Sequence, residues 1–376
     1  MSSKKILYLC DFPIDSIGGA QKSLLSMAYA MDEMGYNIII TSDIMEDKDY
    51  VKSKNIIVEE WKKPKNKYAA VISKIRFLRK CIKKHKPDIV HAQFSQYAYA
   101  MILARKWGLI SDKIPLVFTD RHHFLGYNNR YKEMFTKNIG YLKKVIFTTE
   151  NNLREWEKAL GHKLEQSEVV PNILDDKWFE LCPSNRMDTE KVYVGFAGRY
   201  IDWKRWDTVI EIAERLCIDE KYVISIAISA LEGEDELVDK YIEALREKSN
   251  GQLLVRKSAN ESEMMKFYSE LDFFVLTSEN ESFGRTLVEA MTQENVVMCT
   301  KSGGAPEVVG RDDMMFELLD SEKACEIIRE ISSDESKMKL CKEWFLERSK
   351  LFNRETMKQK MNKIYVELLA TNKEEE

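Results

Sequence analysis

The chain has 376 residues, and this length is too great for one ordinary hydrophobic core, so two domains are expected. Hydrophobic residues make up 44% and charged residues 32%, which predicts a soluble, cytoplasmic protein without a signal peptide or the roughly 20-residue apolar run of a membrane-spanning helix. The seven cysteines are scattered singly, which indicates neither a disulfide framework nor a zinc site. The formal net charge is −4.

Short apolar runs alternate with helical stretches in the first half of the chain. A strand is predicted at residues 5–11, a glycine-containing loop at 13–19, and a helix at 21–34 that ends at Gly35. Further strands are expected at residues 36–41, 88–91, 116–119 and 145–148. This rhythm is typical of a parallel sheet with crossover helices.

The first half is basic and the second half is acidic. Residues 1–170 contain 29 Lys and Arg against 19 Asp and Glu, a net charge of +10, whereas the remainder carries −14. Much of the excess lies from Lys62 to Lys86, where apolar residues recur near helical spacing. This segment is either an ordinary solvated helix or a surface helix that meets the anionic inner face of the cell membrane. Its aromatic residues are too few for a stacking platform, so no nucleic acid is expected as a partner.

The alternation restarts in the second half. Pro171 and Asn172 end the last strand of the first half, and residues 175–189 lack periodicity, which makes them the best linker candidate. Strands follow at residues 192–197, 222–228, 253–255, 271–276 and 296–299, and long charged helices at 322–370. We therefore expect an α/β protein with two doubly wound domains, residues 1–170 and 171–353, the first completed by a C-terminal helix at 354–372.

Residues 278–291, SENESFGRTLVEAM, predict a strand, a loop and a helix with two carboxylates beside the helix start. Glu281 and Glu289 stand eight positions apart, with Gly284 between them. A helix N-terminus suits phosphate, whereas carboxylates accept hydrogen bonds from hydroxyls. Phosphate and polyol at one helix start indicate a sugar nucleotide.

Loops after strands are where doubly wound folds bind ligands, and two of them suit phosphate. Gly18 and Gly19 open the first helix and let backbone approach an anion, although they are not the G-x-G-x-x-G motif of nicotinamide or flavin sites. Arg199 and Lys204 follow a strand of the second half, and their donors suit a diphosphate. Solvated surface cations are the alternative interpretation of that pair.

Two further strand-end loops carry less specific signals. His122 and His123 end a first-half strand, where a neutral histidine could donate to a sugar hydroxyl, and one of the two is expected only to pack. A metal site is not expected there, because no third ligand is evident. Gly303 and Gly304, with Pro306 at a helix start, form a glycine loop one unit after the carboxylate helix.

Together these motifs resemble those of the retaining glycosyltransferases of family four, of the bacterial cell-surface polysaccharide type. This resemblance implies the GT-B fold, two Rossmann-like domains facing a central cleft. The glutamate pair, the Arg199 and Lys204 clamp, the glycine loops and the Val170-Pro171-Asn172 segment follow in the family's order along nearly the whole chain. The chain departs from the family at Arg121, which takes the histidine position of a Thr-x-His pattern, and at Arg205, where a glycine is usual.

The resemblance implies a role for each site residue. Glu289 would bind the ribose hydroxyls, Glu281 would hold the donor sugar, and Arg199 with Lys204 would stabilise the leaving diphosphate. His122 or His123 would contact the donor sugar near the reacting carbon. The remaining donor-binding residues would be Gly18, Gly19, Ser282, Phe283, Gly284, Thr286, Leu287 and, near the base, Arg256.

The resemblance also implies retention through front-face attack, with the acceptor hydroxyl deprotonated by the departing phosphate. No Asp-x-Asp motif stands in a strand-end loop, so we expect neither a metal nor a cofactor besides the nucleotide sugar, a UDP-hexose or UDP-N-acetylhexosamine. The acceptor would be a glycan or a lipid-linked sugar. Its predicted contacts, for which mixed packing at a helix start is the alternative, are His91, Gln93, Gln96 and Tyr97.

Two other classes of function remain open from the sequence. The chain could be an inactive GT-B scaffold that supports another transferase, although intact Glu281, Glu289, Arg199 and Lys204 argue against decay. It could also be a GT-B epimerase or phosphorylase, which would not need an acceptor surface. Turnover of a panel of nucleotide sugars separates these classes.

Overall fold

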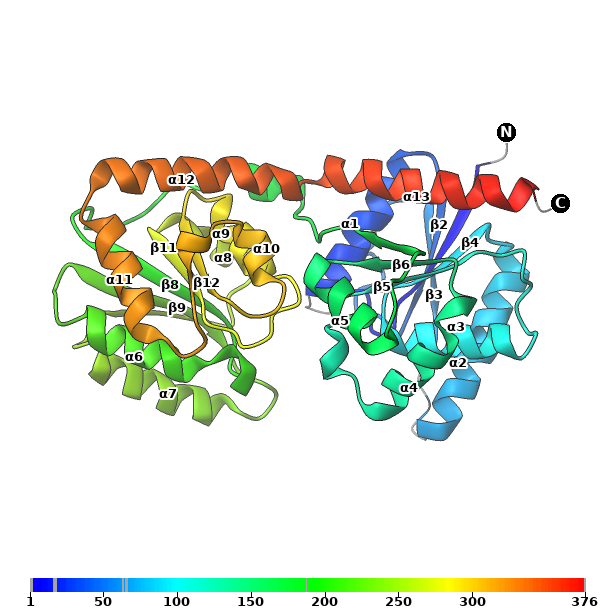
Figure 1. The fold of residues 1–376 in the computed structure, drawn as a ribbon, viewed down its shortest axis with the longest axis horizontal. Helices are drawn as coiled ribbons and strands as arrows, with labels where there is room; N and C mark the ends of the chain where they lie inside the picture. Colours follow the sequence, from blue (N-terminus) through cyan, green and yellow to red (C-terminus); the bar gives the residue numbers. More distant parts are fainter. Residues whose placement is uncertain (1–2, 16–18, 63, 65–66, 187, 375–376) are drawn as a thin grey trace. The chain divides into compact units, whose positions relative to one another are not determined.

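The computed structural model describes residues 3–15, 19–62, 64, 67–186 and 188–374, which form two compact units. The first unit is residues 1–173 with 354–376, and the second is residues 174–353. Each unit is a twisted sheet with helices on both faces (Figure 1). The division falls just after the Pro171-Asn172 break.

Among the described residues, the first unit has seven parallel strands in the order β3-β2-β1-β4-β5-β6-β7. The register pairs Ile6 of β1 with Ile38 of β2 and Ile89 of β4. Parallel strands need crossover connections, and the helical stretches of the sequence supply them. The strands are β1 Lys5–Leu9, β2 Asn37–Ser42, β3 Ile56–Glu60, β4 Ile89–Ala92, β5 Leu116–Asp120, β6 Lys144–Phe147 and β7 Ser167–Val169.

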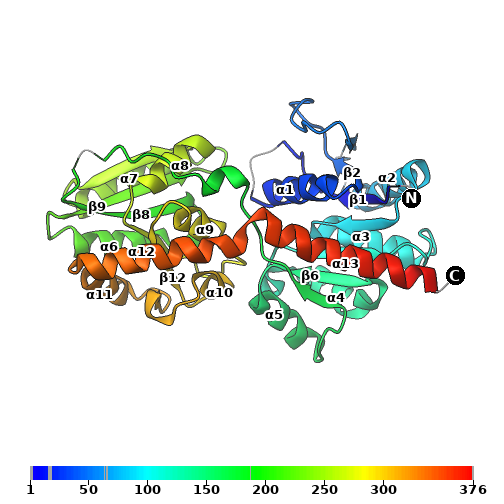
Figure 2. The same ribbon diagram turned by 90° about the horizontal axis from the view of Figure 1, so that it is seen from above.

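Successive residues of these strands face opposite cores. Ile6 and Tyr8 pack with α1 and α13, whereas Leu7 and Leu9 pack with residues of α2 to α5. The C-terminal helix α13 lies against α1, so the chain's end completes this unit (Figure 2). The helices are α1 Gly19–Glu33, α2 Lys67–His85, α3 Ser95–Lys106, α4 Asn129–Asn138, α5 Glu150–Leu160, α13 Arg354–Glu374, and the 3-10 turns η1 Phe124–Gly126 and η2 Ile139–Tyr141.

The second unit has a parallel sheet in the order β10-β9-β8-β11-β12-β13. Its strands are β8 Val192–Arg199, β9 Tyr222–Ser229, β10 Leu253–Lys257, β11 Phe273–Leu276, β12 Val296–Thr300 and β13 Met315–Phe316. Its helices are α6 Trp206–Leu216, α7 Asp235–Lys248, α8 Glu261–Ser269, α9 Arg285–Met291, α10 Ala305–Val309, α11 Ser321–Ser332 and α12 Glu335–Ser349, with 3-10 turns η3 Asp176–Phe179, η4 Asp202–Lys204, η5 Asp312–Met314 and η6 Lys350–Phe352.

The predicted linker at residues 175–189 is wrong, because this segment packs onto the second unit. Trp178 in η3 is buried in its core, and Arg186 forms two hydrogen bonds with the buried carboxylate of Asp272. Strands β3 and β13 were not expected from the sequence. No helix within the described ranges is both long and apolar enough to cross a membrane.

Candidate active site

An ion pair between Lys204 and Glu281 lies at the carboxyl edge of the sheet in the second unit. Lys204 ends the short helix η4 after β8, and Glu281 lies in the loop after β11. Because β8 and β11 are neighbours in the sheet, their loops meet, and the Lys204 ammonium lies 2.6 Å from a Glu281 oxygen. Their side chains are 13% and 16% exposed, and Lys204 also lies 4.6 Å from the Trp203 ring centre. The structure thus brings two predicted site residues into contact.

The late glycine loop packs directly on Glu281. The Gly304 N–H donates to the Glu281 carbonyl oxygen at 2.7 Å. Gly303 has φ +64°, and a Cβ there would lie only 2.3 Å from that same oxygen. The two motifs that the sequence presents separately therefore form one structure, with Ser282 half-buried beside it.

Helix α9 begins directly after the glutamate loop. Gly284 precedes it with φ +82°, and its carbonyl accepts the Leu287 N–H at 2.9 Å. That N–H is engaged within the turn, and the donor-binding role of Leu287 stays a prediction. The Phe283 ring is buried against Phe352, which leaves only its backbone for a ligand. The buried Thr286 hydroxyl has no hydrogen-bond partner among the described residues.

Both carboxylate oxygens of Glu289 have partners within the second unit. Arg285, one helical turn earlier, donates at 2.8 Å, and the buried Tyr268 hydroxyl donates at 3.1 Å. Glu289 is 9% exposed. These two hydrogen bonds hold the Glu289 side chain in place, and each carboxylate oxygen keeps a lone pair for a further donor. The i,i+4 spacing could have revealed Arg285 in the sequence, whereas Tyr268 comes from another helix.

Arg199 and Arg256, the two remaining predicted donor-binding cations of this unit, differ in whether another side chain already pairs with them. The Arg199 guanidinium is exposed and makes no hydrogen bond or ion pair with another described residue, while its carbonyl accepts from the Trp206 indole at 2.8 Å. Arg256 instead pairs with Glu270 at 2.5 Å and lies over the Phe267 ring at 5.5 Å. Arg199 is available to an anion, whereas Arg256 is already neutralised.

The histidine loop follows β5 in the first unit, and its two histidines have different environments. The His123 Nδ1 accepts the Gly126 N–H at 3.1 Å and so caps the turn η1. The His122 ring is exposed and touches the Tyr127 ring edge-on, with centroids 6.0 Å apart. Of the two, His122 is the side chain that a ligand can reach.

Asp120, the last residue of β5, holds this loop and was not expected from the sequence. It is fully buried and receives three hydrogen bonds, from the His122 N–H, the Tyr127 hydroxyl and the Trp156 indole. Burial raises the pKa of this carboxyl, whereas the donors and the nearby His122 favour its charged form.

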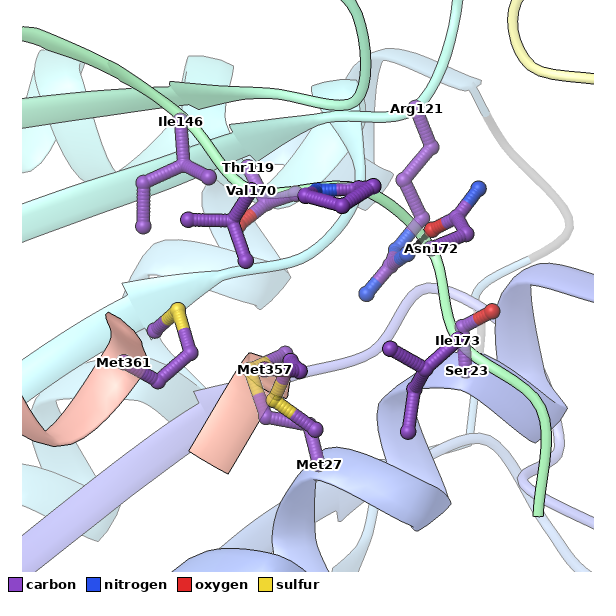
Figure 3. A pocket seen from close by; sticks show the side chains of 11 residues that line it. Ser23, Met27, Thr119, Arg121, Ile146, Val170, Asn172, Ile173, Met357 and Met361 are labelled. Atoms are coloured by element: carbon purple, nitrogen blue, oxygen red, sulfur yellow. Dashed lines mark hydrogen bonds between the residues drawn. The ribbon is translucent and has the colours of Figure 1, made fainter. Parts of the chain in front are cut away.

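Arg121, which takes the histidine position of the Thr-x-His pattern, has a structural role within the first unit. Its guanidinium donates to Asn172 and, at 2.9 Å, to Gln93, so it ties the end of the first unit to β4 and β5. Gln93 is fully buried by this arrangement and offers no surface to an acceptor. Arg121 lines a small, largely apolar pocket (Figure 3) with Ser23, Met27, Thr119, Ile146, Val170, Pro171, Asn172, Ile173, Met357 and Met361.

His91 is a core residue, which corrects its assignment as an acceptor contact. It has no exposed surface, and its ring nitrogens lie 2.7 Å from the hydroxyls of Tyr365 and Thr119. Tyr365 also bonds to Tyr8, so this chain of polar groups fastens α13 to the sheet. Burial lowers the pKa of His91 well below its usual range, which keeps the ring neutral.

Gln96 and Tyr97 belong to a buried ion pair instead of an open surface. Lys74 of α2 donates to Asp11 and, at 2.9 Å, to Gln96. Its ammonium also lies 4.7 Å from the Tyr97 ring centre and 5.5 Å from that of Trp61. The Tyr97 side chain is fully buried, so its prediction as an acceptor contact is not supported, whereas Gln96 is partly exposed.

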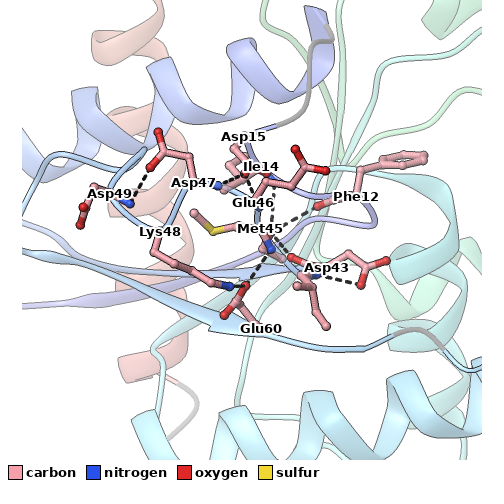
Figure 4. Close-up of polar contacts among 12 residues, drawn as sticks. Phe12, Ile14, Asp15, Asp43, Met45, Glu46, Asp47, Lys48, Asp49 and Glu60 are labelled. Carbon is pink, nitrogen blue, oxygen red and sulfur yellow. Dashed lines mark hydrogen bonds and ion pairs between the residues drawn. The ribbon is translucent and has the colours of Figure 1, made fainter.

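The first glycine loop is described only in part. Gly18 lies outside the described residues, and Gly19 is the exposed first residue of α1. Before it, Asp15 accepts the N–H groups of Glu46 and Asp47 at 2.7 and 2.8 Å and joins the loops after β1 and β2 (Figure 4). Within the described ranges, no group of three or more His, Cys, Asp or Glu residues could hold a metal ion.

Comparisons with known proteins agree with this architecture. The family model described as "Glycosyl transferases group 1" matches residues 180–344, and "Glycosyltransferase Family 4" matches residues 17–178. The chain is 22% identical to the phosphatidylinositol N-acetylglucosaminyltransferase GPI3 subunit of Saccharomyces cerevisiae, over 83% of this chain and 71% of the relative. It is 25% identical to the capsular polysaccharide biosynthesis glycosyltransferase CapM of Staphylococcus aureus, over 47% and 44%.

Solved structures share the fold at low sequence identity. A glycosyltransferase from Rickettsia africae superposes with a TM-score of 0.81 at 18% identity, over 98% of this chain and 99% of the other. Anabaena Alr3699/HepE in complex with UDP gives 0.81 at 19% identity, over 96% and 100%. The predicted α/β fold of two Rossmann-like domains, GT-B, is confirmed.

Proposed function

We propose that this chain, a glycosyltransferase of the GT-B superfamily, moves a sugar from a nucleotide diphosphate sugar to a glycan or lipid-linked acceptor in cell-surface polysaccharide synthesis, with retention of configuration. The observation that carries the proposal is the Lys204–Glu281 pair in the loops after β8 and β11, together with the exposed Arg199 that ends β8. Cations beside a carboxylate suit a ligand that has both a diphosphate and hydroxyls. A UDP-hexose or UDP-N-acetylhexosamine is the proposed donor, in keeping with the UDP bound in the Anabaena structure.

In the proposed reaction, Lys204 exchanges Glu281 for the diphosphate. The ammonium then stabilises phosphate charge together with Arg199, while the released Glu281 carboxylate accepts hydrogen bonds from the donor sugar. Glu289, held by Arg285 and Tyr268, accepts from the ribose hydroxyls. This division gives Arg199, Lys204, Glu281 and Glu289 one role each.

Retention would follow from attack on the same face that the leaving group departs from. The acceptor oxygen forms a bond to the anomeric carbon as its bond to the phosphate oxygen breaks, and the acceptor proton passes to that phosphate oxygen. His122, exposed in the first unit, is the proposed contact near the reacting carbon. We propose that charge stabilisation by Arg199 and Lys204 needs no metal ion.

A panel of nucleotide sugars tests this function, with and without membrane extract from the source cells. We expect transfer or slow hydrolysis of one UDP-sugar, with retained configuration by NMR and unchanged rates in EDTA. Epimerised donor would indicate a GT-B epimerase instead. No turnover of any donor, despite a folded protein, would favour the inactive scaffold.

A lipid-linked acceptor fits the basic surface of the first unit. On α2, Ile75, Leu78 and Cys81 are buried, whereas Ile72, Arg76, Lys80 and Lys83 are exposed along one face. Each basic residue near an anionic bilayer contributes about 1 kcal/mol to binding. The names of the yeast and staphylococcal relatives, which concern phosphatidylinositol and capsular polysaccharide, suit an acceptor at a membrane.

Sedimentation with anionic vesicles tests the membrane partner. Reversing Arg76, Lys80 and Lys83 to Glu should abolish binding to vesicles that contain phosphatidylglycerol. Reversing the exposed Lys240, Lys266 and Lys339 of the second unit makes the same change in net charge and should leave binding nearly intact. Equal loss in both triple variants would mean that only net charge matters and would remove α2 from the proposal.

A further inference from the structure

We propose that Asp120 is a positioning residue that fixes the His122 loop for sugar transfer, an inference that rests on the proposed function. Asp120 ends β5 at the carboxyl edge of the first sheet. Its side chain has no exposed surface, so it cannot reach a substrate as a nucleophile or base in this conformation. Any effect on the reaction must therefore pass through the groups that it binds.

The two carboxylate oxygens of Asp120 serve different partners. Oδ1 accepts the His122 N–H at 3.0 Å and the Tyr127 hydroxyl at 2.6 Å. Oδ2 accepts the Trp156 indole N–H of α5 at 2.6 Å. One oxygen thus faces the loop that carries His122, while the other faces the aromatic core.

The Oδ1 contacts restrain both parts of His122. The first holds its backbone directly, and the second orients Tyr127, whose ring meets the His122 ring at an interplanar angle of 65°. Among the described residues, no hydrogen bond reaches the His122 ring itself, so the direction of the ring depends on the backbone hydrogen bond and on the contact with the Tyr127 ring. His123, by contrast, is fixed by its own cap on Gly126.

Steady-state kinetics with the identified donor and acceptor test this role. Asp120→Asn keeps the shape but turns one acceptor into a donor, and we expect kcat to fall about tenfold or more with the donor KM within about twofold. Trp156→Phe is the control, because it removes only the hydrogen bond to the Asp120 oxygen that faces the core. At a temperature where this variant is folded, its kcat should stay within about twofold of the wild type.

A double-mutant cycle separates positioning from general damage. If Asp120 acts through His122, then Asp120→Asn should lower kcat little further when His122→Ala is already present. Full additivity of the two losses, or a loss in Trp156→Phe equal to that in Asp120→Asn, would overturn the proposal.

Amide hydrogen exchange measured by NMR supplies a readout that needs no turnover. The His122 amide should be protected in the wild type, exchange faster in Asp120→Asn and remain protected in Trp156→Phe. Fast exchange in the wild type would refute the positioning role even in an active enzyme. A protected amide in a protein that turns over no donor would instead refute the proposed function and leave Asp120 as a structural clamp only.

Discussion

The carboxyl edges of the two sheets hold their charged groups in different ways. In the second unit, Lys204 and Glu281 pair with each other at a partly exposed position. In the first unit, Lys74 and Asp11 pair where side-chain exposure is 3% and 0%. The same place in the same kind of fold thus carries a reachable ion pair in one unit and a sealed one in the other.

This difference decides which pair a ligand can open. A fully exposed ion pair contributes about 0–1 kcal/mol. The Lys204–Glu281 pair is more accessible than the Lys74–Asp11 pair, so a diphosphate can replace Glu281 beside Lys204 at a lower cost than it could open the sealed pair. Removing one partner of a buried pair costs about 3–5 kcal/mol, because a charge remains in an apolar surrounding. The Lys204–Glu281 pair of the second unit therefore suits ligand binding, whereas the Lys74–Asp11 pair of the first unit suits rigidity.

The largest expected effect is on stability, in the first unit. Lys74→Met removes the ammonium that neutralises buried Asp11, and unfolding in urea should show a loss of about 3–5 kcal/mol. Lys74→Met combined with Asp11→Leu should recover most of this loss. A loss below about 1 kcal/mol in the single variant would mean that the two pairs do not differ as described.

Lys204→Met should show the opposite pattern, with a large effect on activity and a small one on stability. We expect kcat to fall about a hundredfold, as for loss of one donor to developing charge, and the free energy of unfolding to change by less than about 1 kcal/mol. Glu281→Gln serves as the matched variant, because it breaks the same pair and leaves the cation. It should weaken donor binding more than it lowers kcat at saturation.

The two histidines should separate by function. His122→Ala is expected to lower kcat about tenfold, since its exposed ring is the proposed sugar contact. His123→Ala should instead lower stability by about 1 kcal/mol, through loss of the cap on Gly126, with kcat nearly unchanged. Reversed outcomes in the kinetic and melting measurements would assign the contact to His123.

A further expected effect is the pH dependence that His91 gives to stability. Burial lowers the pKa of His91 in the folded chain, whereas in the unfolded chain this pKa has its usual value near 6.5. Below pH 6.5 the unfolded chain therefore binds a proton at His91 that the folded chain does not bind. Stability should fall as the pH drops from 6.5, by up to about 1.4 kcal/mol per pH unit. His91→Gln should show a shallower slope in the same titration, whereas an equal slope would place the proton elsewhere.

The alternation of apolar runs and helices was sufficient to predict the fold. It missed β3 and β13 for physical reasons. β3 is an edge strand with a mixed burial pattern and two glutamates at its end, and β13 has only two residues. The linker prediction failed because Trp178 and Arg186 are held by partners far along the chain, which no local pattern reveals.

Candidate site residues were predictable where the residue type and its position after a strand were enough to indicate a role. Glu281 and Lys204 were identified by residue type after a strand, and sheet order then joined their loops. Burial was not predictable in the same way. His91 is sealed by Tyr365, which lies 274 positions later, so its polar character looked like a surface property in the sequence.

Binding of UDP by calorimetry tests most directly the central claim that the second unit holds the donor nucleotide. The wild type should bind UDP, and Glu289→Ala should lose at least about tenfold in affinity, because the ribose hydroxyls lose their acceptor. Tyr268→Phe, which removes only a partner of that carboxylate, should stay within about threefold. Unchanged affinity in a folded Glu289→Ala protein would contradict the account.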